Sequence, residues 1–319
     1  MRVLITGIAG FAGSHLAELA LARGAEVAGT LLPGAPVDNL AHIQSRIVTV
    51  PCDLTEPGAA GRVLAEAKPD RVFHLAGAAV VGTSWAQRAE VLRANLDGTF
   101  QLLEGLRTCP APCLLVSSSE VYGAVAEAAQ PIPESQPVCP VSPYGLSKTC
   151  QELYAAYYVR MERLPIVVVR AFNHVGPRQA PGFVWSDIAR QVAAIENGRR
   201  PAVLEIGTAT TRRDFTDVRD MVRAYWLALE RGGPGEVYNA ASGRAVAIQE
   251  IVGGFLARAT CSIGVRVSTE RVRPMDLPLL LGDAGRLRAL TGWSPTIPLE
   301  QSLSDVLADW RRRLQAEGA

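Results

Sequence analysis

The sequence predicts an α/β protein with a doubly wound parallel sheet and a smaller C-terminal α/β lobe. Short β-branched runs alternate with helical segments through the first half of the 319-residue chain, and this alternation is typical of parallel sheets. The runs are apolar throughout instead of alternating with polar residues, which indicates that helices cover both faces of the sheet. A glycine-rich turn follows the first run, as expected where such a sheet binds a nucleotide.

The elements of the first half follow one another in a regular order. We expect strands over residues 2–6, 26–30, 46–53, 71–77, 113–119 and 165–172. Helices are expected between them over residues 11–23, 58–68, 87–107 and 143–163. Ser142 and Pro143 mark the start of the last helix, because serine is a favoured N-cap and proline fits the first helical position.

The second half has a looser pattern. A glycine- and proline-rich loop is expected over residues 173–183, followed by helices near 184–197, 218–231, 248–259 and 299–314 with short strands between them. This half has no second glycine motif, so we expect it to form the substrate side. The chain is therefore divided into a nucleotide-binding domain, residues 1–172, and a substrate-binding lobe, residues 173–319, with room for the chain to cross back.

Composition and charge exclude several classes of partner. The chain has 32 basic and 31 acidic residues and a formal net charge of +1, so nucleic acid is not an expected partner. It shows neither a signal-peptide layout nor an apolar segment of membrane-spanning length, so no membrane association is expected. Six scattered cysteines predict reduced thiols in a cytoplasm. Cys109 and Cys113 have no histidine or second cysteine pair nearby, and no metal site is expected.

The glycine-rich turn reads TGIAGFAG and places Gly7, Gly10 and Gly13 between the first strand and the first helix. The spacing is G-x-x-G-x-x-G, a variant of the best-known dinucleotide motif. Small residues let the backbone turn tightly, so that the N–H groups of the helix can meet a pyrophosphate. The turn therefore predicts a dinucleotide site of the Rossmann type.

The end of the second strand bears on the choice of cofactor. A carboxylate there would hold the ribose hydroxyls of NAD and repel the 2′-phosphate of NADP. The chain instead reads Gly29, Thr30 and Leu31, which favours NADP(H), but no arginine follows before Arg46 to hold the phosphate. Both NADP(H) and NAD(H) stay open. Asp53, after the third strand, either accepts from the adenine amino group or caps a turn.

Lysine is rare in this chain, which has only Lys68 and Lys148 among its 32 basic residues. Lys148 follows Tyr144 by four residues, so the two side chains share one face of a helix. An ammonium group beside the phenol, with the helix N-terminus, is expected to lower the pKa of Tyr144. Tyr144 could then exchange a proton with a substrate hydroxyl or carbonyl oxygen. The alternative is an ordinary exposed pair that stabilises the helix by about 0.3 kcal/mol.

Six motifs together resemble those of the extended short-chain dehydrogenase/reductase family. They are TGIAGFAG, HLAG, SSSEVYG, SPYGLSK, FNHVGP and RDFTDVRD, and the resemblance covers nearly the whole chain. The resemblance implies a catalytic set of Ser118, Tyr144 and Lys148, in which Ser118 stabilises charge on the substrate oxygen. It implies cofactor contacts from Gly7, Gly10, Phe11, Ala12, Gly13, Thr30, Asp53, Leu54, Leu75, Ala76, Gly77, Asn95, Tyr144 and Lys148. Of these, Asn95 matches the asparagine that supports the active-site helix.

The second half resembles the enzymes of GDP-deoxyhexose synthesis. The motifs FNHVGPRQAPGFV, RRDFTDVRDMVRAYW, RPMDLPLLLGD and TGWSPTIPLEQSL carry this resemblance. It implies the NAD(P)H-dependent reduction of a GDP-linked 4-keto-6-deoxy hexose, converting GDP-4-keto-6-deoxy-mannose to GDP-rhamnose. The implied substrate contacts are Ser84, Ser119, Asn173, Arg178, Arg213, Arg273 and Asp276. Asp276 stands where relatives usually have a glutamate.

Three other functions stay open. Glu120, two residues after Ser118, is counted with the catalytic residues, because nucleotide-sugar 4,6-dehydratases of the GDP-mannose type carry a glutamate there that removes the C5 proton. The loop LLPGAPVDNLAHIQS is short and has no arginine, unlike that of those dehydratases, which favours reduction. A 4-epimerase with tightly held NAD is another alternative, and a non-catalytic nucleotide-sensing protein on the same fold is the third.

The resemblance also implies a homodimer that pairs through the helices at 87–107 and 143–163.

Overall fold

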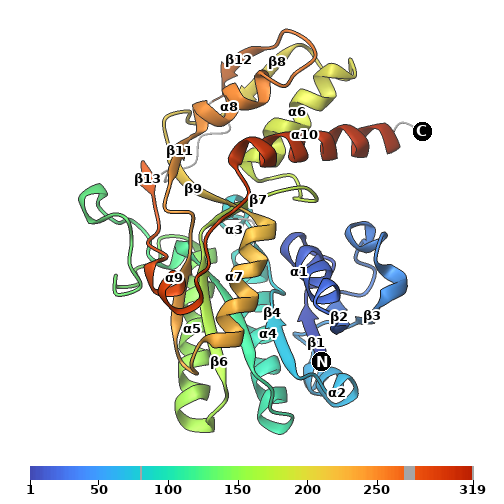
Figure 1. Cartoon of the computed structure of the whole chain (residues 1–319), viewed down its shortest axis with the longest axis vertical. Coiled ribbons are helices and arrows are strands. Elements are labelled where there is room, and N and C mark those ends of the chain that lie inside the picture. The colour runs from blue at the N-terminus through green and yellow to red at the C-terminus, as the bar shows by residue number, and fades with distance from the viewer. Residues whose placement is uncertain (80, 269–276, 318–319) are drawn as a thin grey trace.

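A parallel sheet forms the centre of the computed structural model, which describes residues 1–79, 81–268 and 277–317. Seven strands of the described chain lie in the order β10-β6-β5-β4-β1-β2-β3, each parallel to its neighbours (Figure 1). They are β1 Arg2–Thr6, β2 Glu26–Leu31, β3 Ile47–Pro51, β4 Arg71–His74, β5 Cys113–Ser118, β6 Ile166–Ala171 and β10 Val237–Ala240. The first six start within one residue of their predicted positions, and the predicted fold class is confirmed.

Helices cover both faces of this sheet, as the apolar strands require. On one face lie α1 Phe11–Ala22 and α7 Val218–Arg231, and on the other lie α2 Ala59–Ala67, α4 Arg88–Thr108 and α5 Pro143–Glu162. Neighbouring residues of β1 point to opposite faces. Ile5 therefore joins the cluster around Trp226, while Leu4 joins the cluster around Leu106.

The second half of the chain returns to this sheet. β10 pairs with β6, with Val237 opposite Val168, and α7 packs against α1. α9 Gly285–Thr291 packs in turn against α7 and β10. These segments lie with the nucleotide-binding part of the molecule although they follow residue 172.

The rest of the second half forms a lobe at the carboxyl edge of the sheet. The chain enters this lobe directly from the end of β6, because only one residue separates β6 from β7. One small sheet has the order β11-β9-β13, with β7 paired to β9, and a second pairs β12 with β8. The lobe contains β7 Asn173–Val175, β8 Val203–Ile206, β9 Arg212–Asp217, β11 Ala245–Ala247, β12 Gly264–Val267, β13 Leu279–Leu280, α6 Val184–Glu196, α8 Ile248–Leu256 and α10 Leu299–Ala316. Trp185, Phe255 and Trp310 belong to its separate hydrophobic core.

Two features of the fold differ from the prediction. Residues 173–183 were predicted to be a loop throughout, but Asn173–Val175 pair in parallel with β9. The strand is too short and too polar to give a pattern in the sequence, and it forms because β9 offers it a partner. A short helix, α3 Val81–Ser84, was not predicted either, since four residues show no helical period.

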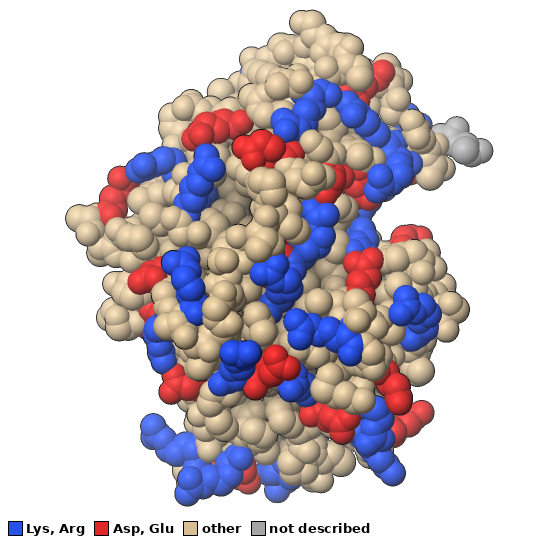
Figure 2. Space-filling model, viewed as in Figure 1, with Lys and Arg blue, Asp and Glu red and all other residues tan. Residues whose placement is uncertain are grey.

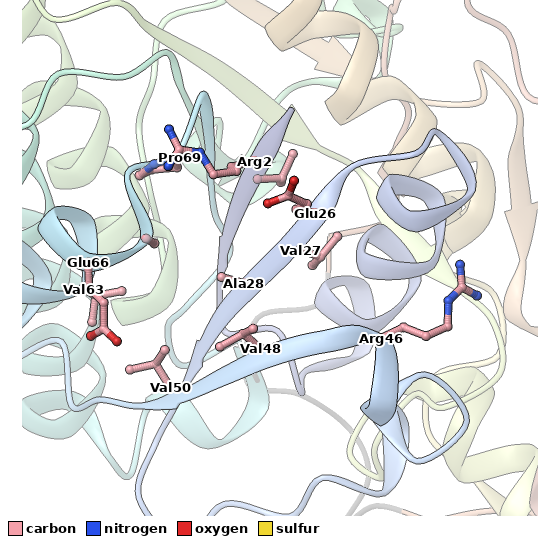
Figure 3. A pocket seen from close by; sticks show the side chains of 12 residues that line it. Arg2, Glu26, Val27, Ala28, Arg46, Val48, Val50, Val63, Glu66 and Pro69 are labelled. Atoms are coloured by element: carbon pink, nitrogen blue, oxygen red, sulfur yellow. The ribbon is translucent and has the colours of Figure 1, made fainter.

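An open groove of about 410 Å³ lies at the edge of the sheet (Figure 3). Its lining includes Val48, Val50 and Val63, with the charged side chains of Arg46 and Glu66. Val48 belongs to the edge strand β3 and is 62% exposed. None of the described residues that line the groove is a predicted site residue, so we do not place the chemistry there.

Charges of both signs are interspersed over the face shown in Figure 2. Among the described residues, many charged side chains form ion pairs, such as Arg311 with Glu196 at 2.7 Å and Arg223 with Asp220 at 2.8 Å. Within the described ranges, no helix combines the length and the apolar character needed to cross a membrane.

Candidate active site

The predicted catalytic side chains come together where β5 ends and α5 begins. Ser118 is the last residue of β5, and Tyr144 and Lys148 lie in the first two turns of α5. All three are buried, with exposed fractions of 8%, 9% and 6%. The Lys148 ammonium donates to the carbonyl of Val116 in β5 at 2.9 Å, which fixes the helix against the strand.

The N-terminus of α5 depends on two small residues of the SPYG motif. Ser142 is the N-cap, as predicted, and its hydroxyl accepts from the Gly145 N–H at 3.0 Å. Gly145 must be small, because a Cβ there would lie 2.6 Å from the Glu120 carbonyl oxygen. The Ser142 hydroxyl also donates to the Glu120 carboxylate at 3.5 Å. Gly145 is therefore a site residue that sequence reasoning missed, although it lies inside a motif that was recognised.

Burial sets the protonation of Tyr144. It raises the pKa of the phenol above its ordinary value; hydrogen bonding to Ser118 opposes this rise, and the Glu120 carboxylate adds to it. The expected lowering of this pKa is wrong for this structure. The reason is geometric: the Lys148 nitrogen lies over the tyrosine ring, 5.8 Å from its centroid, and burial penalises the phenolate more strongly. Tyr144 is thus held as a proton donor.

Burial acts on Lys148 in the opposite sense. It lowers the pKa of the ammonium from 10.5 to about 8, and the Glu152 carboxylate partly offsets this by raising it. Lys148 is therefore charged at neutral pH and loses its charge as the pH rises through about 8. An ammonium that titrates this close to neutrality is typical of functional sites.

The glycine turn has the shape that a dinucleotide needs. A Cβ on Gly13 would lie 2.3 Å from the Gly7 carbonyl oxygen, and one on Gly7 would lie 2.9 Å from the Ala76 Cα atom. Gly7 also has φ of +71°, which favours glycine. Gly10 is the N-cap of α1, whose first turn has no acidic residue. These residues fit a pyrophosphate that meets the positive end of α1.

Five other predicted cofactor residues lie at the same edge of the sheet as this turn. Phe11 and Ala12 form the first turn of α1, and Leu75, Ala76 and Gly77 follow β4 directly. Because β1 and β4 are parallel neighbours, both segments lie at the same edge of the sheet.

Two predicted cofactor residues bond to the protein itself. The backbone oxygen of Thr30 accepts from the N–H groups of Gly7 at 3.0 Å and Ile8 at 3.1 Å, so Thr30 orders the glycine turn. Asp53 accepts from the N–H and the hydroxyl of Thr55 at 2.9 and 2.8 Å, which is the turn-capping alternative. Leu54 beside it is buried.

Asn95 connects the cofactor side to the catalytic helix. Its side chain is fully buried and accepts from the Ala78 N–H at 2.7 Å. Its amide donates to the Ser147 hydroxyl, in α5, at 2.8 Å. This geometry fits the supporting role that the resemblance implies for Asn95, and Ser147 is a partner that sequence reasoning missed.

The predicted substrate contacts lie in several separate segments of the chain. Ser84 ends α3, and Ser119 follows Ser118 directly; both are buried. Asn173 begins β7, and its amide donates to the Asp214 carbonyl at 3.5 Å. Arg213 lies in the adjacent strand β9 and donates to the Leu277 carbonyl at 2.6 Å. Two further predicted contacts, Arg273 and Asp276, lie outside the described residues.

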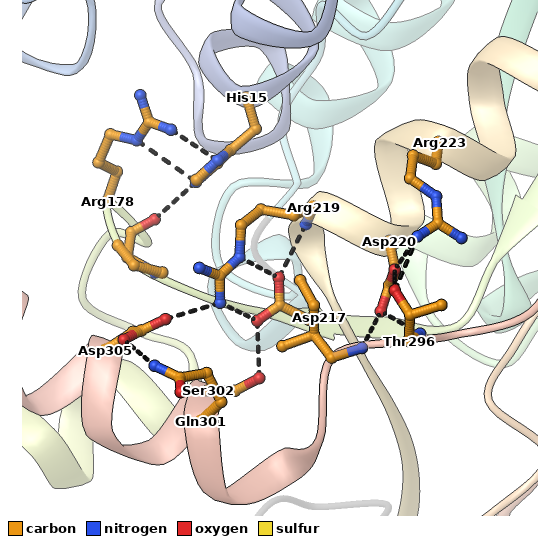
Figure 4. Close-up of polar contacts among 12 residues, drawn as sticks. His15, Arg178, Asp217, Arg219, Asp220, Arg223, Thr296, Gln301, Ser302 and Asp305 are labelled. Carbon is orange, nitrogen blue, oxygen red and sulfur yellow. Dashed lines mark hydrogen bonds and ion pairs between the residues drawn. The ribbon is translucent and has the colours of Figure 1, made fainter.

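Arg178 lies at the joint between the two halves of the chain (Figure 4). Its guanidinium pairs with Glu18 of α1 at 2.7 Å and donates to the Nδ1 atom of His15 at 2.5 Å. Its backbone N–H donates to Asp309 of α10 at 2.8 Å. With these partners Arg178 fastens the lobe to α1, and its predicted contact with substrate stays a prediction.

The carboxylates at the end of the RDFTDVRD motif are structural (Figure 4). Asp217 caps α7 and accepts from the Ser302 hydroxyl at 2.6 Å. Asp220 accepts from the N–H groups of Thr296 and Ile297, both at 2.8 Å. They hold the start of α10 against α7.

The fold and the site together define a nucleotide-dependent oxidoreductase of the short-chain dehydrogenase/reductase class. Comparison with known proteins gives the family. The family model described as GDP-mannose 4,6 dehydratase matches residues 4–306. The chain belongs to this family.

The names of different relatives give different activities. GDP-6-deoxy-D-mannose reductase of Pseudomonas aeruginosa is 35% identical over 320 residues, which cover 99% of this chain and 99% of that protein. GDP-mannose 4,6 dehydratase of Drosophila melanogaster is 28% identical over 95% of this chain and 84% of that protein.

Solved structures agree with this assignment. RMD from P. aeruginosa complexed with NADPH has a TM-score of 0.85 and 35% identity, over 98% of this chain and 99% of that one. UDP-glucose 4-epimerase of Thermus thermophilus complexed with NAD has a TM-score of 0.86 and 29% identity, over 98% and 99%.

Proposed function

We propose that this chain is an NAD(P)H-dependent reductase of the 4-keto group of a GDP-linked 4-keto-6-deoxy hexose, converting GDP-4-keto-6-deoxy-mannose to GDP-rhamnose. The observation that carries this proposal is the full-length likeness to GDP-6-deoxy-D-mannose reductase, which covers 99% of both chains. The fruit-fly dehydratase, by contrast, extends beyond the match, which covers 84% of its length.

The protonation of the site supports reduction. A bound nicotinamide cofactor would supply the hydride for C4. Tyr144, held in its neutral form by burial, donates its proton to the C4 oxygen as negative charge develops there. The Ser118 hydroxyl donates a hydrogen bond to the same oxygen, and the Lys148 ammonium stabilises the phenolate that remains.

Dehydration is the second candidate, and one observation favours it. The Glu120 carboxylate is close enough to Tyr144 to raise the pKa of the phenol. A carboxylate beside the acid/base tyrosine is where a dehydratase would keep the base that removes the C5 proton. The same carboxylate could instead hold a sugar hydroxyl.

The two reactions differ in their use of the cofactor. A reductase oxidises one NAD(P)H in each turnover, whereas a dehydratase regenerates its cofactor. The test supplies GDP-mannose alone in one tube, and GDP-4-keto-6-deoxy-mannose with NADPH or NADH in another. We expect loss of absorbance at 340 nm in the second tube only. A 4-keto sugar that accumulates in the first tube, with no loss in the second, would favour the dehydratase.

We also propose a homodimer that pairs through α4 and α5. Large apolar residues of these two helices are exposed: Phe100, Leu146, Leu153, Tyr157 and Met161. Exposed apolar residues gathered on adjacent helices are typical of an interface.

A cytoplasmic location fits the six cysteines, which are all unpaired.

A further inference from the structure

A row of polar residues crosses three strands of the otherwise apolar sheet. Ser117 of β5 lies opposite Arg170 of β6, which lies opposite Asn239 of β10. All three are buried, with exposed fractions of 2%, 7% and 0%. Burying polar groups lowers the stability of a fold unless all of them have hydrogen-bond or ion-pair partners. The presence of this row in an apolar sheet therefore calls for an explanation.

Glu152 of α5 meets this row. Its carboxylate accepts from Arg170 at 2.7 Å (Nη2) and 3.0 Å (Nε), and from the Ser117 hydroxyl at 2.5 Å. Glu152 follows Lys148 by one helical turn, as Lys148 follows Tyr144. Three successive turns of α5 therefore contact three successive residues at the end of β5: Glu152 contacts Ser117, Lys148 contacts Val116 and Tyr144 contacts Ser118.

The row continues toward the substrate lobe. Arg170 donates to the Tyr122 hydroxyl at 3.0 Å, and that hydroxyl donates to Asn239 at 2.7 Å. The Asn239 amide donates to the carbonyls of Ile132 at 2.9 Å and Asp283 at 3.1 Å. Asp283 lies a few residues after Leu277, whose carbonyl accepts from the predicted substrate contact Arg213.

We propose that Glu152, paired with Arg170, is a positioning residue of the active site: it aligns the end of β5 with α5 and supplies a negative charge one helical turn after Lys148. The proposal rests on the proposed function, in which Lys148 assists the proton transfer from Tyr144. In this proposal the buried pair contributes to the chemistry of the site as well as to the packing of the fold.

The charges around Lys148 support this role. On its own helix the Lys148 ammonium lies over the Tyr144 ring and is influenced by the Glu152 charge. From β4 it acts on His74, whose pKa is lowered by burial and by the Lys148 charge. Arg170 of β6 lies behind Glu152. Glu120, beside the N-terminus of α5, acts on Tyr144. Glu152 is the carboxylate that raises the pKa of Lys148 against burial.

The lysine content allows a direct test without substrate. Because Lys68 and Lys148 are the only lysines, protein labelled with ¹⁵N at the lysine Nζ atoms gives two titration curves, and exposed Lys68 is the internal reference. In Glu152→Gln the Arg170 charge is no longer neutralised. We expect the titration midpoint of Lys148 to fall by about one pH unit. In Arg170→Gln we expect it to rise, because Glu152 then has Lys148 as its main countercharge.

Glu162→Gln is the matched control, since it removes the same charge from an exposed position near the end of α5. We expect no movement of the Lys148 midpoint there. In the kinetic arm, the alkaline fall of kcat should begin about one pH unit lower in Glu152→Gln than in the wild type. Wild-type protein without reductase activity would refute the proposed function but leave the titration result intact.

Two results would overturn the inference. The first is a Lys148 midpoint in Glu152→Gln and Arg170→Gln that equals the wild-type value. The second is failure of both variants to fold, seen by circular dichroism, which would make the pair structural only.

Discussion

Burial of the phenol is the main influence on what Tyr144 can do. A tyrosine whose pKa is raised is a poor base and remains a proton donor at neutral pH, which suits reduction of a ketone. Hydrogen bonding to Ser118 opposes this rise of the pKa but does not outweigh burial. The sequence motif marks Tyr144 as an acid or a base, and its buried surroundings favour the acid role, which is the direction of ketone reduction.

Tyr144→Phe should abolish turnover while cofactor binding changes little, because the variant loses one hydroxyl from an otherwise intact pocket. A positioned general acid contributes about 10²–10⁴-fold to the rate. Steady-state kinetics and cofactor titration measure the two effects. Turnover above about a tenth of the wild-type rate would make the general-acid role wrong.

Lys148→Arg is expected to lose most activity although it preserves the charge. Lys148 is 6% exposed and its nitrogen reaches the Val116 carbonyl, and a planar guanidinium does not fit where a slim ammonium does. The measurement is kcat at pH 7, with Lys68→Arg as the matched control at an exposed position. Near-normal kcat in Lys148→Arg would show that only the charge matters.

At the scale of elements, local chemistry decided what could be predicted. Six strands of the central sheet were predicted because they are apolar and bounded by turn residues, and the SPYGLSK motif carried its own N-cap. The seventh, β10, was not predicted individually. β9 reads RRDFTD and could not be recognised, because its polar residues are buried only through their partners. Glu152 and Arg170 were missed for a related reason: they lie 18 residues apart, and only sheet and helix packing brings them together.

The joint between α1 and the lobe can be tested through Arg178. Burial alone would raise the pKa of Glu18, but hydrogen bonds from His15 and Arg178 outweigh it and hold the pKa far below 4.5. Arg178→Met should therefore lower the free energy of unfolding by about 1 kcal/mol at pH 7, a modest value because Glu18 is 37% exposed. Urea denaturation measures the change.

The pH dependence of that change has a definite sign. A carboxyl group whose folded pKa is lowered stabilises the fold above its unfolded pKa, here about 4.5, and loses this contribution as the pH falls toward the folded value. The difference between wild type and Arg178→Met should shrink below pH 4.5. A difference that stays constant down to pH 3 would mean that Glu18 does not contribute through its charge.

At the scale of the whole molecule, the α4 and α5 surface bears on assembly and on the site together, because α5 also carries Tyr144 and Lys148. Leu153 on this helix is 64% exposed. Leu153→Glu should convert a dimer to a monomer, measured by light scattering at micromolar concentration, because it places a charge in an apolar interface. Val48→Glu, on exposed β3, is the control. A monomeric wild-type protein would contradict the homodimer.

The central claim is that hydride reaches C4 of a GDP-linked 4-keto sugar while Tyr144 protonates its oxygen. The most direct measurement supplies GDP-4-keto-6-deoxy-mannose with NADPH carrying deuterium at the transferable position, and locates the deuterium in the product by NMR. We expect one deuterium at C4 of the sugar in each product molecule and none in a reaction with Tyr144→Phe. A product without deuterium at C4, formed while the cofactor stays reduced, would contradict the account.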